Sequence, residues 1–116
     1  MQRDLVHLLD ILQAAQRIQM FVQGIDRAAF DASLKDQSAV IWQIAVIGEA
    51  VRRLSQEYRA THPEIPWQLM AGMRSKLIHD YDRIDLVEVW KVIQNDIPAL
   101  IAQLEPLVPP DDETEE

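Results

Sequence analysis

Cysteine is absent from this chain of 116 residues. The absence excludes a disulfide framework, a thiol nucleophile and a thiolate metal site. Glycine occurs only three times and aromatic residues make up 6% of the chain. Together with abundant Leu, Ile, Ala and Gln, these low frequencies favour helix throughout.

Long uninterrupted apolar runs are also missing. The N-terminal stretch MQRDLVHLLDILQ carries Asp4, His7 and Asp10 among its apolar residues, which is atypical of a signal peptide. No window approaches the length of a membrane span. We therefore expect a cytoplasmic protein that does not enter a membrane.

The net charge of −8 is unevenly distributed along the chain. The last six residues, DDETEE, supply five acids and no base, so the rest of the chain has a net charge of only −3. We expect a single helical domain over residues 1–108 and a solvated, disordered acidic tail over 109–116. A mildly acidic body argues against broad nonspecific binding of nucleic acids, and leaves room for a small basic site.

Apolar residues recur at three- and four-residue steps along most of the chain, which predicts amphipathic helices. The first is expected over Gln2–Gln23 and is ended by Gly24, followed by a short helical turn at Arg27–Ser33. A second long helix is expected over Asp36–Ala60. Gly48 lies in its middle, where glycine lowers helix stability, so we expect it to permit a close approach of another helix.

Prolines and caps divide the second half of the chain. The segment HPEIP ends the second helix, and Pro66 suits the first turn of a third. A break follows near Asp80–Ile84, and Asp85 with Glu88 forms an aspartate version of a capping box that opens a fourth helix. Pro98 should bend that helix or restart it with Asp96 as cap. The expected fold is an all-α, up-and-down bundle of four to five helices.

The stretch MRSKLIHDYDRIDL, residues 73–86, gathers an arginine, a histidine and a tyrosine. On an ideal helix Arg74 and Tyr81 share a face, whereas His79 lies about 140° round and ~7.5 Å along from Arg74. Arg74 and His79 can therefore face one site only if the helix ends near His79. A guanidinium binds phosphate and a histidine moves protons near neutral pH, which suffices to cleave RNA through its 2′-hydroxyl. DNA lacks that hydroxyl.

Structural roles remain open for the same three residues. A helical arginine is commonly solvated or ion-paired, and a histidine at a helix end can simply interact with the helix dipole. Tyr81 can be a core residue with a solvated hydroxyl.

The arrangement Arg74-(four residues)-His79-Asp80-Tyr81 matches an R-x4-H-x-Y motif. Further segments agree in the same order: RDLVHLLDILQA, VIGEAVRRLS, HPEIPW, LIHDYDRIDLVEVW and NDIPAL. In these segments the chain resembles the HepT-like toxins, a branch of the HEPN superfamily. The resemblance covers nearly everything before the acidic tail.

This resemblance implies a HEPN-like bundle that forms a homodimer with the motifs at a shared cleft. It implies a metal-independent endoribonuclease, without a cofactor, in which Arg74 holds the scissile phosphate and His79 transfers a proton. It also implies a cognate MNT-type nucleotidyltransferase antitoxin that adds AMP to Tyr81. Asp80 and Ser75 receive no role. The alternative is an inactive HEPN binding module that serves as partner and substrate of a nucleotidyltransferase.

Four bases have two readings. Lys76, Arg83, Arg52 and Arg53 can contact RNA, or they can pair with neighbouring acids. Glu49 follows Gly48 within an apolar face, so we expect it to be partly buried, with Arg74 or His79 as a candidate partner.

Two other residue types are expected to be structural. None of the three tryptophans lies in a basic segment of the sequence, so core or interface positions are expected for them. His7 and His62 lack ligand spacing, so no metal site is expected.

Overall fold

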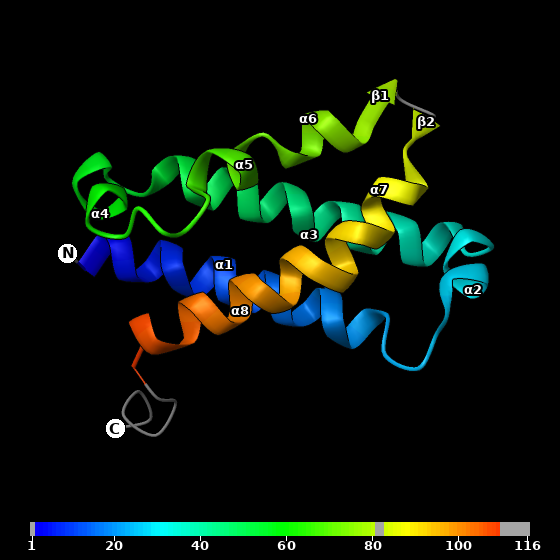
Figure 1. The fold of residues 1–116 in the computed structure, drawn as a ribbon, viewed down its shortest axis with the longest axis horizontal. Coiled ribbons are helices and arrows are strands. Elements are labelled where there is room, and N and C mark those ends of the chain that lie inside the picture. Colours follow the sequence, from blue (N-terminus) through cyan, green and yellow to red (C-terminus); the bar gives the residue numbers. More distant parts are fainter. Residues whose placement is uncertain (1, 81–82, 110–116) are drawn as a thin grey trace.

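The computed structural model describes residues 2–80 and 83–109, and these form a helical bundle with one short hairpin (Figure 1). The predicted all-α class is confirmed. Tyr81 and all but the first residue of the acidic tail lie outside the described residues, so their predicted roles stay predictions. The elements, in order, are α1 Gln2–Phe21, α2 Arg27–Asp31, α3 Leu34–Arg53, α4 Gln56–Thr61, α5 Trp67–Ala71, α6 Met73–Leu77, β1 Ile78–Asp80, β2 Arg83–Ile84, α7 Leu86–Lys91, the π-helical turn Val92–Asp96, α8 Ile97–Leu104 and a 3-10 turn Glu105–Leu107.

The long helices α1 and α3 run antiparallel and form the centre of the bundle (Figure 1). Helix α8 packs against α1, while α5 and α6 pack against α3. The core side chains repeat at helical spacing and are almost fully buried, among them Ile11, Ile18, Ile44, Ile47 and Leu104. Burial of these apolar faces is what holds the short connecting helices in place.

Short polar and glycine signals set the first turns as predicted. Helix α1 ends at Phe21, and Gly24 then takes a positive φ of 78° that glycine adopts at little cost. The predicted helical turn is α2, whose cap Asp26 accepts a hydrogen bond from the Ala29 N–H at 2.9 Å.

The second predicted helix, Asp36–Ala60, is wrong at its C-terminal end. Helix α3 stops at Arg53, and α4 starts anew after Ser55, whose hydroxyl accepts from the Tyr58 N–H at 3.0 Å. The buried Asp4 of α1 accepts hydrogen bonds from both the N–H and the hydroxyl of Ser55, each at 2.8 Å. A tertiary contact from the start of the chain thus replaces the helical hydrogen bonds at this break.

We expect Asp4→Ala to lower the free energy of unfolding by about 1–2 kcal/mol at neutral pH. The hydrogen bond from the Ser55 backbone N–H, helped by the Ser55 hydroxyl, holds the pKa of Asp4 below its ordinary value. Because the folded pKa lies below the unfolded one, the stabilisation is present above about pH 4 and is lost as the pH falls through the folded pKa. Urea unfolding should therefore show a difference from the native chain that narrows on acidification.

Asp10→Ala is the matched control for that measurement. Asp10 is an exposed carboxylate on the same helix and forms none of the described side-chain hydrogen bonds. An equal loss of stability in both variants would contradict the role given to Asp4.

The C-terminal helical segment begins where it was predicted to begin, but its structure near Pro98 differs from the prediction. Asp85 caps α7 by accepting from the Glu88 N–H at 3.1 Å, which confirms Asp85 as the cap. The Asp85 N–H itself donates to the Leu77 carbonyl, the place that Glu88 would take in a capping box. The chain then stays helical through the π turn Val92–Asp96 into α8. Pro98 lacks an N–H, and the wider π turn accommodates this without a break. Asp96 forms no cap, so the predicted restart is wrong.

Candidate active site

The R-x4-H-x-Y segment crosses the boundary between α6 and the hairpin. Arg74 lies in α6, which ends at Leu77, and His79 lies in strand β1 (Figure 1). The predicted end of the helix before His79 is therefore confirmed. The joint placement of the Arg74 and His79 side chains in one site stays a prediction.

The hairpin is short and its base is fixed by the chain on both sides. Ile78 pairs with Ile84 and Asp80 with Arg83 in antiparallel register, with an irregularity between the two pairs. The Asp85 N–H donates to the Leu77 carbonyl at 2.9 Å. The residues just before His79 are thereby held to those that follow the hairpin, so the backbone of His79 leaves α6 in an extended direction.

A close contact between α3 and the α5–α6 junction positions Arg74. A Cβ added at Gly48 would lie 3.2 Å from the Ala71 carbonyl oxygen and 3.4 Å from that of Met70. The predicted close approach at Gly48 is thus confirmed. Arg52 donates from Nη2 to the same Ala71 carbonyl at 2.6 Å. Since Ala71 lies three residues before Arg74, this contact fixes where α6 begins relative to α3.

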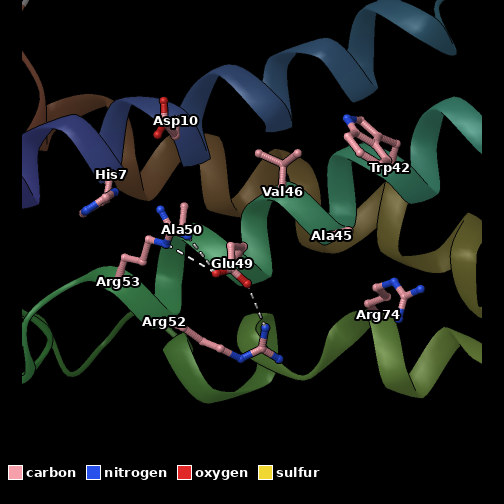
Figure 2. A pocket seen from close by; sticks show the side chains of 10 residues that line it. All are labelled: His7, Asp10, Trp42, Ala45, Val46, Glu49, Ala50, Arg52, Arg53 and Arg74. Atoms are coloured by element: carbon pink, nitrogen blue, oxygen red, sulfur yellow. Dashed lines mark hydrogen bonds and ion pairs between the residues drawn. The ribbon is translucent and has the colours of Figure 1, made fainter.

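Arg74 lines a pocket of about 510 Å³ between α1, α3 and α6 (Figure 2). Figure 2 shows Arg74 and Trp42 toward one end of it and His7 toward the other. The lining residues are His7, Asp10, Trp42, Ala45, Val46, Glu49, Ala50, Arg52, Arg53 and Arg74. The fold therefore gathers Arg74 with three of the predicted site residues, namely Glu49, Arg52 and Arg53.

The expected burial of Glu49 is wrong. Its side chain is 59% exposed and pairs with Arg53 at 3.3 Å and with Arg52 at 3.8 Å. Both arginines follow Glu49 at helical spacing on α3, so the pairs are local, and solvent removes the need for a buried partner. Exposed pairs of this kind stabilise a protein by ~1 kcal/mol or less, so they leave both guanidinium groups able to bind an anion.

Arg74 differs from these two arginines. It is exposed and forms no ion pair or hydrogen bond with any side chain that the structure describes. None of the described side chains therefore occupies its donors, and a guanidinium can hold a phosphate in a bidentate manner.

The other predicted bases lie outside the described lining of this pocket. Lys76 and Arg83 are exposed, on α6 and β2 respectively. Lys76 lies two residues from Arg74, so the turn of the helix directs it about 200° away. Ser75 is likewise exposed on α6. A role for Lys76 or Arg83 would require a ligand longer than the pocket.

Trp42 is the site residue that the sequence interpretation missed. Trp67 is buried and Trp90 packs on Phe30 with ring centres 5.4 Å apart, but Trp42 is 68% exposed. A core position is therefore wrong for Trp42, while the other place expected for it, an interface, stays a prediction. A signal was present, because position 42 falls roughly opposite the core stripe of Val40, Ile44, Ile47 and Val51 on a helix. The basic neighbour Arg74 comes from 32 residues further along the chain.

Neither a metal-binding cluster nor a membrane-spanning helix occurs in the described parts of the chain. There, no group of three or more His, Cys, Asp or Glu side chains is arranged to hold a metal ion. None of the described helices combines the length and apolar character that crossing a membrane requires.

Comparison with known proteins agrees with the motif. The family model described as "Ribonuclease HepT-like" matches residues 11–107. The chain is 41% identical over 101 residues to a "Probable ribonuclease HepT" of Thermococcus cleftensis, covering 87% of this chain and 92% of that protein.

Two further relatives have similar coverage. A "Putative RNase" of Methanocaldococcus jannaschii is 36% identical over 84% of this chain and 90% of its own length. One of Caldanaerobacter subterraneus is 35% identical over 88% of this chain and 91% of its own. No solved structure matches the chain significantly. By its family match and by these relatives, the chain belongs to the HepT-like ribonuclease family.

Proposed function

We propose that this chain is a metal-independent endoribonuclease in which Arg74 binds the scissile phosphate and His79 transfers a proton. Membership of a ribonuclease family supports an RNase-type activity. The observation that carries the residue roles is the guanidinium of Arg74, which lines an open pocket without a partner among the described side chains. It lies five residues before a histidine that follows the end of α6.

The reaction uses the substrate's own nucleophile. His79 removes the proton of a ribose 2′-hydroxyl, and the 2′-oxygen attacks the adjacent phosphorus. The bond from phosphorus to the 5′-oxygen breaks, and that oxygen takes up a proton. The products are a 2′,3′-cyclic phosphate end and a 5′-hydroxyl end. Arg74 stabilises the negative charge that grows on the non-bridging oxygens, and electrostatic stabilisation of this kind is usually the largest single term in catalysis.

The remaining bases extend the site along the RNA backbone. Arg53 and Arg52 line the same pocket as Arg74, and Lys76 and Arg83 lie exposed nearby in sequence. Two copies of the chain, joined as a homodimer with both motifs at one cleft, would double this local positive field. The site would then bind several phosphates although the body of the protein is mildly acidic.

The isolated chain is expected to cleave single-stranded RNA in the presence of a chelator and to leave cyclic phosphate ends. End-group analysis of the fragments checks both features. DNA of the same sequence is the control and should stay intact, because it lacks the 2′-hydroxyl. Absence of RNA cleavage would instead favour a binding module that serves a nucleotidyltransferase without a reaction of its own.

We further propose that the chain is the toxin of a toxin–antitoxin pair and that an MNT-type nucleotidyltransferase silences it by adding AMP to Tyr81. A phosphate two residues beyond His79 would compete with RNA for the charge of Arg74. Intact mass after incubation with the cognate enzyme and ATP should show adenylyl increments that Tyr81→Phe abolishes. Increments that persist in Tyr81→Phe would assign the modification to another residue.

A further inference from the structure

Trp42 is exposed to solvent and lines the pocket that also contains Arg74, which has no partner among the described side chains. Its side chain is 68% exposed on α3, and it lines the same pocket as Arg74 of α6 (Figure 2). By contrast, Trp67 is buried and donates its ring N–H to the His62 carbonyl at 3.0 Å. A single exposed apolar residue is common on a protein surface. Trp42 stands out because it lines the same pocket as a guanidinium, so a ligand there meets both an aromatic face and a cation.

The pocket around Trp42 offers one surface that suits a nucleobase and another that suits a phosphate. Ala45 and Val46 extend the apolar wall beside the indole along α3. Arg74, which belongs to α6, lies on the opposite wall of the pocket (Figure 2). A flat aromatic face stacks on any nucleobase, because every base offers a π-face. A guanidinium binds the phosphate.

We infer that Trp42 is a stacking platform for an unpaired base of single-stranded RNA whose neighbouring phosphate is held by Arg74. The inference rests on the proposed function for the identity of the ligand and names its class. A base within a duplex is already stacked on both faces and cannot lie on the indole, so the pocket selects unpaired RNA. Stacking is tolerant of sequence, so this contact favours no particular base.

The balance of charge in the pocket of one chain favours such a contact. Three arginines, Arg52, Arg53 and Arg74, are opposed by Glu49 and Asp10, which leaves a small positive excess. Phosphate contacts alone give affinity in proportion to the charges neutralised, and that number is small here. Stacking adds affinity that does not depend on net charge.

Binding of an uncleavable oligonucleotide isolates this contact from catalysis. We expect Trp42→Leu, which keeps an apolar side chain but loses the π-face, to weaken binding of a short 2′-O-methyl oligouridine about 5- to 150-fold. Trp42→Phe should bind close to the native chain. The control is Leu34→Ala, since Leu34 is 71% exposed on the same helix and lies outside the described lining of the pocket. Fluorescence anisotropy gives the dissociation constants.

A matched abasic oligonucleotide identifies the base as the group that stacks. The native chain should bind the abasic oligonucleotide more weakly than the oligouridine. The ratio of the two dissociation constants should be about the same as the loss of oligouridine affinity caused by Trp42→Leu. Trp42→Leu should bind the two oligonucleotides equally, because the interaction is already gone.

Two results would overturn the inference. One is a Trp42→Leu variant that binds the oligouridine as tightly as the native chain does. The other is a loss of affinity in Trp42→Leu that accompanies a smaller assembly in sedimentation velocity, since this face would then contact a second copy of the chain. The proposed function fails separately: a native chain that binds oligouridine through Trp42 but cleaves no RNA would refute only the ribonuclease proposal.

Discussion

Replacing Arg74 with alanine is expected to slow RNA cleavage about 10²–10³-fold, the usual cost of removing one preorganised group that stabilises transition-state charge. The guanidinium is exposed and unpaired among the side chains that the structure describes, so its loss leaves no buried charge behind. Stability should therefore be close to that of the native chain. Cleavage rates under single-turnover conditions and a urea unfolding curve, measured on the same preparation, separate the two effects.

Two variants sharpen the Arg74 measurement. Arg74→Lys keeps the charge but loses the bidentate fork, so it should recover only part of the rate. Arg27→Ala removes an exposed arginine of α2 that pairs with Asp31 at 2.9 Å, outside the described pocket lining, and should cleave like the native chain. If Arg74→Ala cleaves RNA at the rate of the native chain, Arg74 does not bind the scissile phosphate.

The parts of the fold that sequence predicted correctly depend on short-range signals. Gly24 ends α1, and Asp85 caps α7 through a residue three positions away. The end of α6 before His79 also follows from its immediate neighbours in the chain. These features involve residues within a few positions of one another, so a short stretch of the sequence is enough to predict them.

The predictions that failed involve contacts between distant segments. The break between α3 and α4 depends on Asp4, which lies 51 residues before Ser55. The burial predicted for Glu49 is a separate case, because its two arginine partners lie three and four residues away on the same exposed face of α3. The pairing of Trp42 with Arg74 needs α3 and α6 to be packed together, and Gly48 allows that packing. Neither the contact of Asp4 with Ser55 nor the packing of α3 on α6 can be read from helical periodicity alone.

His79→Ala is expected to reduce cleavage about 10²–10⁴-fold, the range for removal of a general acid or base. Since Arg74 and Trp42 remain, the variant should bind an uncleavable oligonucleotide like the native chain. The loss should therefore appear in kcat and leave KM nearly unchanged. A histidine titrates near neutral pH, so the pH–rate profile of the native chain should contain a limb in that region which the variant lacks.

Added imidazole distinguishes proton transfer from a structural role for His79. It should restore part of the cleavage rate of His79→Ala, because a free imidazole can enter the space left by the side chain and carry the same proton. Added imidazole should leave the cleavage rate of Arg74→Ala unchanged, since that variant keeps its histidine and lacks only the guanidinium that is proposed to bind the phosphate. His62→Ala is the control: this ring packs on Tyr58 at 4.9 Å, outside the described pocket lining, and its removal should not slow cleavage. Equal cleavage by His79→Ala and the native chain would remove the proton-transfer step from the mechanism, whatever the effect at Arg74.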